Sequence, residues 1–352
     1  MTAQNINKID KTSDTANVSV TAQHEQGSDN KKIGTDYSFK REIIWKVAFF
    51  YATIYLLGFY GLYRTLFYSS RLTMIYSIMI GVASQVGINM GAHRLYAHKA
   101  FKAKLPLRIV LNMLQTLAGM YSTYYWVRDH RLHHKYSDTD ADLHNSNRGF
   151  FFSHCGWLMS KKHPAVREYG KTIDMSDLKA DKVIMFQKKY YLPIYIFLSS
   201  LVVAVPVWLW NETLTNSILS SHFFRWILYL NITMCVNSWA HFFGTKPYDK
   251  YIRPIESNLL SFLIVGEGWH NYHHTFPWDY QAAEYGLHYS LTTFLIELSS
   301  YLGLAHDLKS ASQQTVEKRR LRTGNVPLKG QPIDYNSNGN NNNNRFLLRY
   351  TL

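Results

Sequence analysis

Eight histidines in three short clusters are the residues of this chain best suited to chemistry. They form the sequences His93-Arg-Leu-Tyr-Ala-His98, His130-Arg-Leu-His133-His134 and His270-Asn-Tyr-His273-His274. Imidazole is a good ligand for iron, zinc, copper and nickel. Eight imidazoles exceed the roughly six ligands of an octahedral ion. The count therefore predicts two metal ions held close together.

The spacing within the clusters supports this interpretation. In the second and third clusters, one histidine is followed three and four positions later by two more. Such positions share one face of an α-helix, so each cluster can aim three nitrogens at one point. His93 and His98 are five positions apart, which is about 140° on a regular helix. This pair either ends a helix or serves two different ions.

Two other metal sites fit the sequence less well. Glu267-Gly-Trp-His270 is the Glu-x-x-His pair of soluble carboxylate di-iron bundles, which need it on two helices together with two further Glu residues. The pair occurs here once, so we expect Glu267 to lie behind the ligands. A zinc hydrolase needs only three protein ligands and an open position, and eight histidines exceed that number.

Apolar stretches must position these clusters. Four of them approach the ~20 residues that span a bilayer, with Tyr and Trp near their ends as in an aromatic belt. They cover residues 43–63, 72–92, 191–210 and 223–243. We expect an all-α membrane protein with four transmembrane helices. Four buried helices of a soluble protein are the alternative, but such helices rarely run this long without a polar face.

The connections between the stretches predict the topology. Short turns separate the first from the second and the third from the fourth, and about 100 residues separate the second from the third. Two helical hairpins follow, with both termini and the middle segment on one side. All three histidine clusters then lie on that side, in a helical cap. Lys40, Arg41 and Lys46 favour a cytosolic cap.

Composition sets the outer boundaries of the fold. Residues 1–36 are polar and read as a disordered tail, residues 37–325 as one membrane domain, and residues 326–352 as a low-complexity tail with an asparagine tract. Residues 103–125 are apolar, but Pro106 and the nearby charges favour a helix lying in the membrane interface.

The chain is basic and almost free of cysteine. Its 352 residues carry a formal net charge of +14, and two cysteines imply no disulfide framework. We find no nucleic-acid motif, so we expect no nucleic-acid partner; the charge suits an anionic lipid or an anionic substrate.

The sequences around the clusters resemble those of a known family. They are Gly91-Ala-His93-Arg-Leu-Tyr-Ala-His98, Trp126-Val-Arg-Asp-His130, Val236-Asn-Ser-Trp-Ala-His241 and Gly266-Glu-Gly-Trp-His270. Together they resemble the membrane-bound acyl-CoA desaturases, the stearoyl-CoA desaturase family, of the animal and insect type. The resemblance covers roughly residues 38–325.

This resemblance implies a di-iron centre with nine histidine ligands, the eight of the clusters and His241. Asn237, one helical turn before His241, would hold a water on one iron. His144, His154 and His163 lie outside the spacing and are expected to support the site. The family implies O2, two electrons from cytochrome b5 and its NADH-dependent reductase, and residence in the endoplasmic reticulum membrane.

The resemblance also implies substrate contacts. Arg128, Asp129, Lys161 and Lys162 match positions that hold the CoA part of a fatty acyl-CoA. Trp126 matches a tunnel-lining position. Gly81 on the second helix, with Ser84 one turn on, falls near the tunnel end, where a glycine is expected to leave the pocket open to long acyl chains. The family default is a cis Δ9 double bond. Four departures from the family pattern bear on chain length and double-bond position; they are Met90, Tyr96, Met234 and Trp239.

Three alternatives stay open at this point. The chain could be another membrane di-iron oxygenase, such as a hydroxylase or a sterol or sphingolipid desaturase. It could be an acyl-CoA desaturase of different regiospecificity. It could also be a catalytically silent scaffold, although no histidine of the clusters is missing.

Overall fold

The computed structural model describes residues 33–284 and 290–325 of the chain. The tails predicted at 1–36 and 326–352 lie outside the described residues, apart from residues 33–36. Within that exception, Thr35 Oγ1 donates to the Asp138 carbonyl oxygen at 3.3 Å and the Asp36 N–H donates to Asp140 Oδ2 at 2.7 Å. The described fold therefore already includes residues 35 and 36.

The first two predicted apolar stretches form two long helices. α1 (Trp45–Phe67) is followed by α2 (Arg71–Val86), which continues directly into the π-helix η2 (Gly87–Ala97). Ser70 caps α2, because its Oγ accepts the Thr73 N–H at 3.2 Å. Both α1 and the joint helix from Arg71 to Ala97 are long and apolar enough to cross a membrane.

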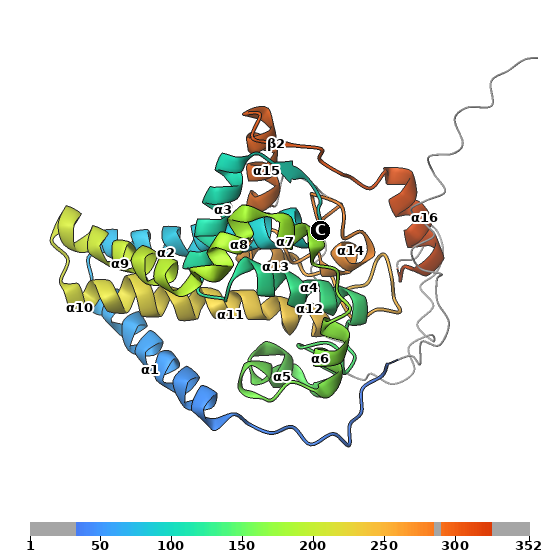
Figure 1. The fold of residues 1–352 in the computed structure, drawn as a ribbon, viewed down its shortest axis with the longest axis horizontal. Helices are drawn as coiled ribbons and strands as arrows, with labels where there is room; N and C mark the ends of the chain where they lie inside the picture. The colour runs from blue at the N-terminus through green and yellow to red at the C-terminus, as the bar shows by residue number, and fades with distance from the viewer. Residues whose placement is uncertain (1–32, 285–289, 326–352) are drawn as a thin grey trace, which may run out of the picture. The chain divides into compact units, whose positions relative to one another are not determined.

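Of the last two predicted apolar stretches, one forms a membrane-length helix. α9 (Tyr191–Trp210) matches the predicted bounds and is also long and apolar enough to span. Where we expected a single helix over 223–243, the chain forms the end of η5 (Ile218–Phe224), then α11 (Arg225–Asn237) and α12 (Trp239–Phe242). The short helix α10 (Leu214–Ser217) precedes η5. Three helices of the described residues, not four, therefore meet the criteria for a span. η5 lies against α1, and α11 lies against α2 (Figure 1).

Short helices form the remainder of the described chain. Those between η2 and α9 are α3 (Leu105–Leu117), α4 (Thr123–Tyr136), η3 (Ser146–Arg148), α5 (Phe150–His154), η4 (Gly156–Met159), α6 (Pro164–Gly170), α7 (Ser176–Ala180) and α8 (Lys182–Lys189). Those after α12 are α13 (Asn258–Leu263), α14 (His270–Thr275), α15 (Leu291–Tyr301) and α16 (Gln313–Thr323). Strands β1 (Lys102–Ala103) and β2 (Ala305–His306) pair antiparallel and join the two sets, so α3 and α15 lie near each other in Figure 1.

The apolar run predicted over 103–125 is interrupted. α3 ends at Leu117, and Gly119 follows with a φ of 70°, a conformation that glycine adopts without steric cost. α3 exposes Leu105, Ile109 and Val110. Its place in the membrane interface stays a prediction.

The π-helix η2 is the most buried element of the described chain. Every residue from Gly87 to Ala97 is buried. It packs closely on α3, since a Cβ on Gly87 would lie 2.3 Å from the backbone nitrogen of Gln115. Only glycine permits that approach. η2 thereby carries the first histidine cluster deep into the fold.

Candidate metal centre

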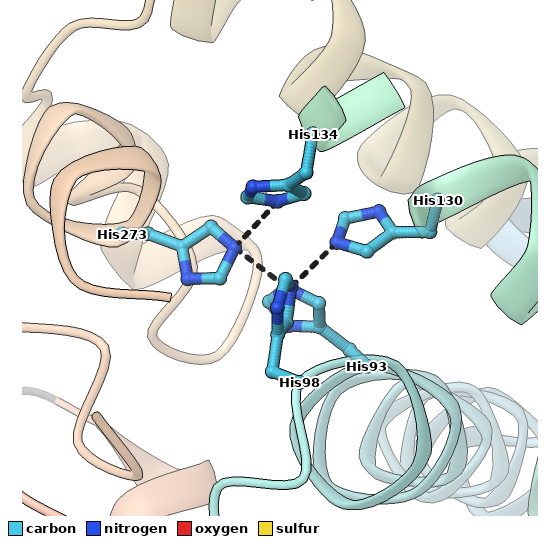
Figure 2. A group of neighbouring side chains, drawn as sticks. All are labelled: His93, His98, His130, His134 and His273. Atoms are coloured by element: carbon cyan, nitrogen blue, oxygen red, sulfur yellow. Dashed lines mark hydrogen bonds between the residues drawn. The ribbon is translucent and has the colours of Figure 1, made fainter. Parts of the chain in front are cut away.

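Nine histidines converge in two adjoining groups. The ring nitrogens available for binding lie within 4.8 Å of one another inside each group. Group A consists of His93, His98, His130, His134 and His273, and Figure 2 shows these five rings facing one another. Group B consists of His133, His241, His270 and His274. The structure thus brings together all eight histidines of the clusters and His241.

The π-helix explains how the first cluster contributes. The His98 N–H donates to the His93 carbonyl oxygen at 3.1 Å, which is the i to i+5 hydrogen bond of a π turn. Helix η2 ends at Ala97, and both rings point into group A. This placement favours a shared ion over the alternative in which the pair serves two different ions.

The other two clusters each divide between the groups. α4 supplies His130 and His134 to group A and His133 to group B; α14 supplies His270 and His274 to group B and His273 to group A. The expectation that each cluster aims three nitrogens at one point is wrong. Adjacent helix positions differ by about 100°, so the i, i+4 pair faces one group and the i+3 ring faces the other.

Buried carboxylates orient three of the rings. His93 Nδ1 lies 3.2 Å from Glu267 Oε2. His133 Nδ1 lies 2.8 Å from Asp142 Oδ2. His241 Nδ1 lies 3.2 Å from Asp138 Oδ2. Each Nδ1–H donates to its carboxylate, which leaves the Nε2 lone pair free. This is the usual arrangement of metal-binding histidines. Glu267 lies behind His93, on the side away from the ring's Nε2.

The remaining rings are kept neutral. Burial, together with neighbouring imidazoles and other cationic groups, holds the pKa well below its usual value for six of them. These six are His98, His130, His134, His270, His273 and His274. The neutral imidazole is the form that binds metal.

These features fit a cation in each group. Nε2 of His273 lies 3.0 Å from Nε2 of both His93 and His134, and Nε2 of His98 lies 2.8 Å from that of His130 (Figure 2). Nε2 of His241 and Nδ1 of His273 are buried and have no hydrogen-bond partner in the described part of the chain. Converging lone pairs without protons need a cation to be satisfied.

The other predicted polar residues surround the groups. Asn237 lines the cleft beside group B, and its Nδ2 lies 3.6 Å from Met234 Sδ. His144 packs edge-on against Trp157 and lies near His133 and Asp142, a trio that could itself hold an ion. His154 and His163 belong to neither group; His163 caps α6, since its Nδ1 accepts the Ala165 N–H at 3.2 Å.

A largely apolar cleft borders both groups. Trp126 lines it and stacks on His130 with ring centroids 4.9 Å apart. Tyr121, Thr233 and Met234 line it too. Of the four departures named above, only Met234 is among the lining residues of this cleft. The cleft lies where a substrate chain could pass the metal groups.

Basic side chains lie beside this cleft, because Asp129 lines both the cleft and a neighbouring surface groove. Asp129 joins them: Arg128 Nη2 lies 2.5 Å and Lys162 Nζ 3.5 Å from its carboxylate. Lys161 is exposed and pairs with Glu42. Lys162 lines two neighbouring surface grooves, each of which also contains Arg167 and Lys171. All four residues predicted to hold CoA therefore lie in one region.

Gly81 does not face open space, contrary to the sequence-based expectation. A Cβ there would lie 1.8 Å from the Tyr229 ring, whose hydroxyl donates to the Ile78 carbonyl oxygen at 3.0 Å. Gly81 is not among the residues lining the cleft of Trp126. Tyr229 therefore occupies the space that the glycine was expected to leave, one turn before the cleft residue Thr233.

Sequence reasoning assigned no role to Asp138, Asp142 or Tyr229. The two aspartates follow the second histidine cluster in Ser137-Asp-Thr-Asp-Ala-Asp142. Three acidic residues directly after a ligand cluster were the available signal. No sequence feature marked Tyr229.

Fold and site together define a mostly helical protein with three membrane-length helices and a histidine-rich centre suited to metal. The chain belongs to the fatty acid desaturase family, whose model matches residues 69–291. It is 48% identical to an acyl-CoA Delta-9 desaturase of Acheta domesticus over 290 residues, 81% of this chain and 80% of the relative. It is 46% identical to an acyl-CoA Delta-12 desaturase of Tribolium castaneum, over 83% of this chain and 82% of the relative. It is likewise 46% identical to the stearoyl-CoA desaturase of Homo sapiens, over 81% of this chain and 79% of the relative.

Proposed function

We propose that this protein is an oxidoreductase, an acyl-CoA desaturase that places a cis double bond in a saturated fatty acyl-CoA. The observation that carries the proposal is the pair of buried histidine groups, five rings and four, beside an apolar cleft. Family membership supports it. The named relatives include Delta-9, Delta-12 and Delta(11) enzymes. Their variety makes Δ9 our proposal for this chain rather than a consequence of its family.

The ligand assignment follows the two groups. The five histidines of group A would hold one iron, and the four of group B would hold the second, with a water on Asn237 completing it. When bound, such a centre supplies the activation of O2 needed to break unactivated C–H bonds, which side chains alone cannot do. The protein's own part is to hold neutral imidazoles in place and keep the cleft dry.

The reaction requires electrons from outside the chain. Two hydrogens leave adjacent methylene carbons, O2 takes up these together with two electrons and two protons, and two waters form. We propose cytochrome b5, reduced by its NADH-dependent reductase, as the donor. The formal net charge of +14 suits an acidic carrier protein.

The substrate would lie with its polar end on the basic region and its acyl chain in the cleft. Arg128, Lys161 and Lys162 would meet the CoA phosphates, with Asp129 holding Arg128 and Lys162 in place. Trp126 would line the chain beside His130. The carboxyl end is then fixed relative to the histidine groups, and this fixes the position of the double bond.

We propose the membrane arrangement from the helix contacts and from family membership. The run from α10 through α11 would act as the fourth span, beside α1 and α2. The cap and both termini would face the cytosol from the endoplasmic reticulum membrane. Residues 37–325 would form the membrane domain.

Expression in yeast lacking its own desaturase tests this proposal. We expect growth without added unsaturated fatty acids, and double-bond mapping by mass spectrometry should give Δ9 products of 16 to 18 carbons, a family-based range. A His274→Ala variant is the control. Hydroxylated acyl products, or an unsaturated sphingoid or sterol, would assign the chain to another reaction of this metal class.

A further inference from the structure

The carboxylates behind the two histidine groups are unequal in number and in charge. Group B has two, Asp142 behind His133 and Asp138 behind His241. Group A has one, Glu267 behind His93. Asp138, Asp142 and Glu267 are all buried. In a buried site, charges act strongly on a nearby ion.

The charge of Glu267 is already balanced. The Arg94 guanidinium lies 2.8 Å from Glu267 Oε1 and is 1% exposed. Arg94 is held in place by further hydrogen bonds to the Tyr280 carbonyl oxygen at 2.7 Å and Thr293 Oγ1 at 2.9 Å. The pair adds no net charge beside group A.

The two aspartates of group B have no such partner. Among the ion pairs of the described residues, Asp138 and Asp142 pair only with histidines. Asp140, between them in sequence, is different: its Oδ1 lies 2.5 Å from Arg148 Nη2. Two carboxylates that pair with no arginine or lysine in the described part of the chain therefore lie behind the four rings of group B.

One loop builds this arrangement. Asp142 Oδ2 accepts both His133 Nδ1–H and the Asp138 N–H, at 2.8 and 2.9 Å. Asp138 has a φ of 59°, which is uncommon except for Gly, Asn and Asp. Its Oδ1 accepts the Ser146 N–H at 3.1 Å. The loop thereby fixes ligands from two helices, α4 and α12, at once.

We infer that Asp138 and Asp142 are positioning residues that make the group B ion the more electron-rich of the two, so that it binds iron more tightly and gives up an electron first. The inference rests on the proposed di-iron function. Hydrogen-bonded carboxylates raise the basicity of metal-binding imidazoles, and their loss commonly lowers metal affinity about 10- to 100-fold. Uncompensated negative charge also favours the ferric over the ferrous ion.

The test uses the full-length protein loaded with 57Fe, reduced by dithionite and titrated with ferricyanide. Mössbauer spectra follow the ferrous and ferric ions during the titration. We expect two distinct ferrous sites, of which one is oxidised first. Asp138→Asn and Asp142→Asn should each raise the potential of that first step, or cause selective loss of that one iron. Glu267→Gln should alter the second step.

Asp140→Asn is the matched control, because Asp140 lies in the same loop but pairs with Arg148 and His163 and with no ring of either group. It should leave both steps unchanged. The inference is overturned if Asp142→Asn keeps both irons at wild-type potentials, or if Glu267→Gln moves the first step. Failure of the proposed function would give a different result, because wild-type protein itself would then bind no iron pair and form no unsaturated product.

Discussion

The His98 N–H and the His93 carbonyl oxygen, 3.1 Å apart, close a π turn that brings two histidines five residues apart into one group. A regular α-helix would place the two rings about 140° apart. π turns are rare and cluster at functional sites. In this chain the turn allows the end of one membrane-length helix to contribute both His93 and His98 to group A.

The two histidine groups predict how ligand variants behave. His134→Ala removes a ring from group A and His274→Ala one from group B; each should abolish desaturation and lower the iron content, with membrane insertion unchanged. Insertion depends on the apolar helices and not on these rings. Iron analysis and product analysis of the same membranes measure both effects. His306→Ala, an exposed histidine in β2, is the control. Full activity with unchanged iron in either ligand variant would refute the assignment.

The basic region predicts an effect on substrate binding. Reversal of Lys161 and Lys162 together to Glu should raise the KM for acyl-CoA severalfold, and more at low salt, because exposed charges are screened as ionic strength rises. Steady-state assays at two salt concentrations measure this. A charge-matched control is the reversal of Lys102 and Lys309, exposed residues that line neither groove. An unchanged KM in the first variant would make Lys161 and Lys162 ordinary surface charges.

The contact between Gly81 and Tyr229 changes the prediction for acyl chain length. Tyr229→Ala should admit longer acyl chains, because it empties the space beside Gly81 one turn from Thr233. Gly81→Trp should shorten them or destabilise the fold, since packed interiors resist added volume. The double bond should keep its distance from the carboxyl end in both. Mass spectrometry of the products from mixed substrates measures this, with exposed Tyr60→Ala as control. A moved double bond at constant chain length would show that Tyr229 does not end the tunnel.

Glu256 predicts a dependence of stability on pH. Burial raises its pKa to about 8, against backbone hydrogen bonds from Tyr272 and Asn271. The folded state therefore holds the proton more tightly than the unfolded state, in which the pKa is near 4.5. The contribution of protonated Glu256 to the free energy of unfolding is fully present below pH 4.5 and is lost as the pH rises through about 8. Glu256→Gln should thus raise the melting temperature progressively from pH 5 to pH 8.5, while exposed Glu168→Gln should not. A constant difference across this range would contradict the assigned cause.

Much of the site could be predicted from sequence because ligand type and spacing are local properties. The nine histidines converge as the clusters and His241 indicated. Their division between two groups could not be predicted, because i+3 and i+4 positions share a helix face only loosely and packing decides which ring faces which group. The π turn at His93 likewise depends on the packing of Gly87 against α3.

The remaining differences come from contacts between distant segments. Gly81 looked open from its own sequence, yet a tyrosine 148 residues later fills the space. The fourth apolar stretch, 223–243, is divided among the end of η5, α11 and α12, and hydropathy reveals neither the change of helical pitch after Phe224 nor the break at Ser238. The contacts of Asp142 with His133 and of Asp138 with His241 depend on how the loop packs between α4 and α12, which the sequence does not reveal.

The iron content of the purified protein tests the central claim most directly. Protein produced with ample iron and analysed by metal mass spectrometry should contain two irons per chain, because nine imidazoles and a water on Asn237 nearly fill two sites. His134→Ala and His274→Ala should each reduce that number. A single zinc per chain without iron, in protein that still forms the unsaturated product, would contradict the account.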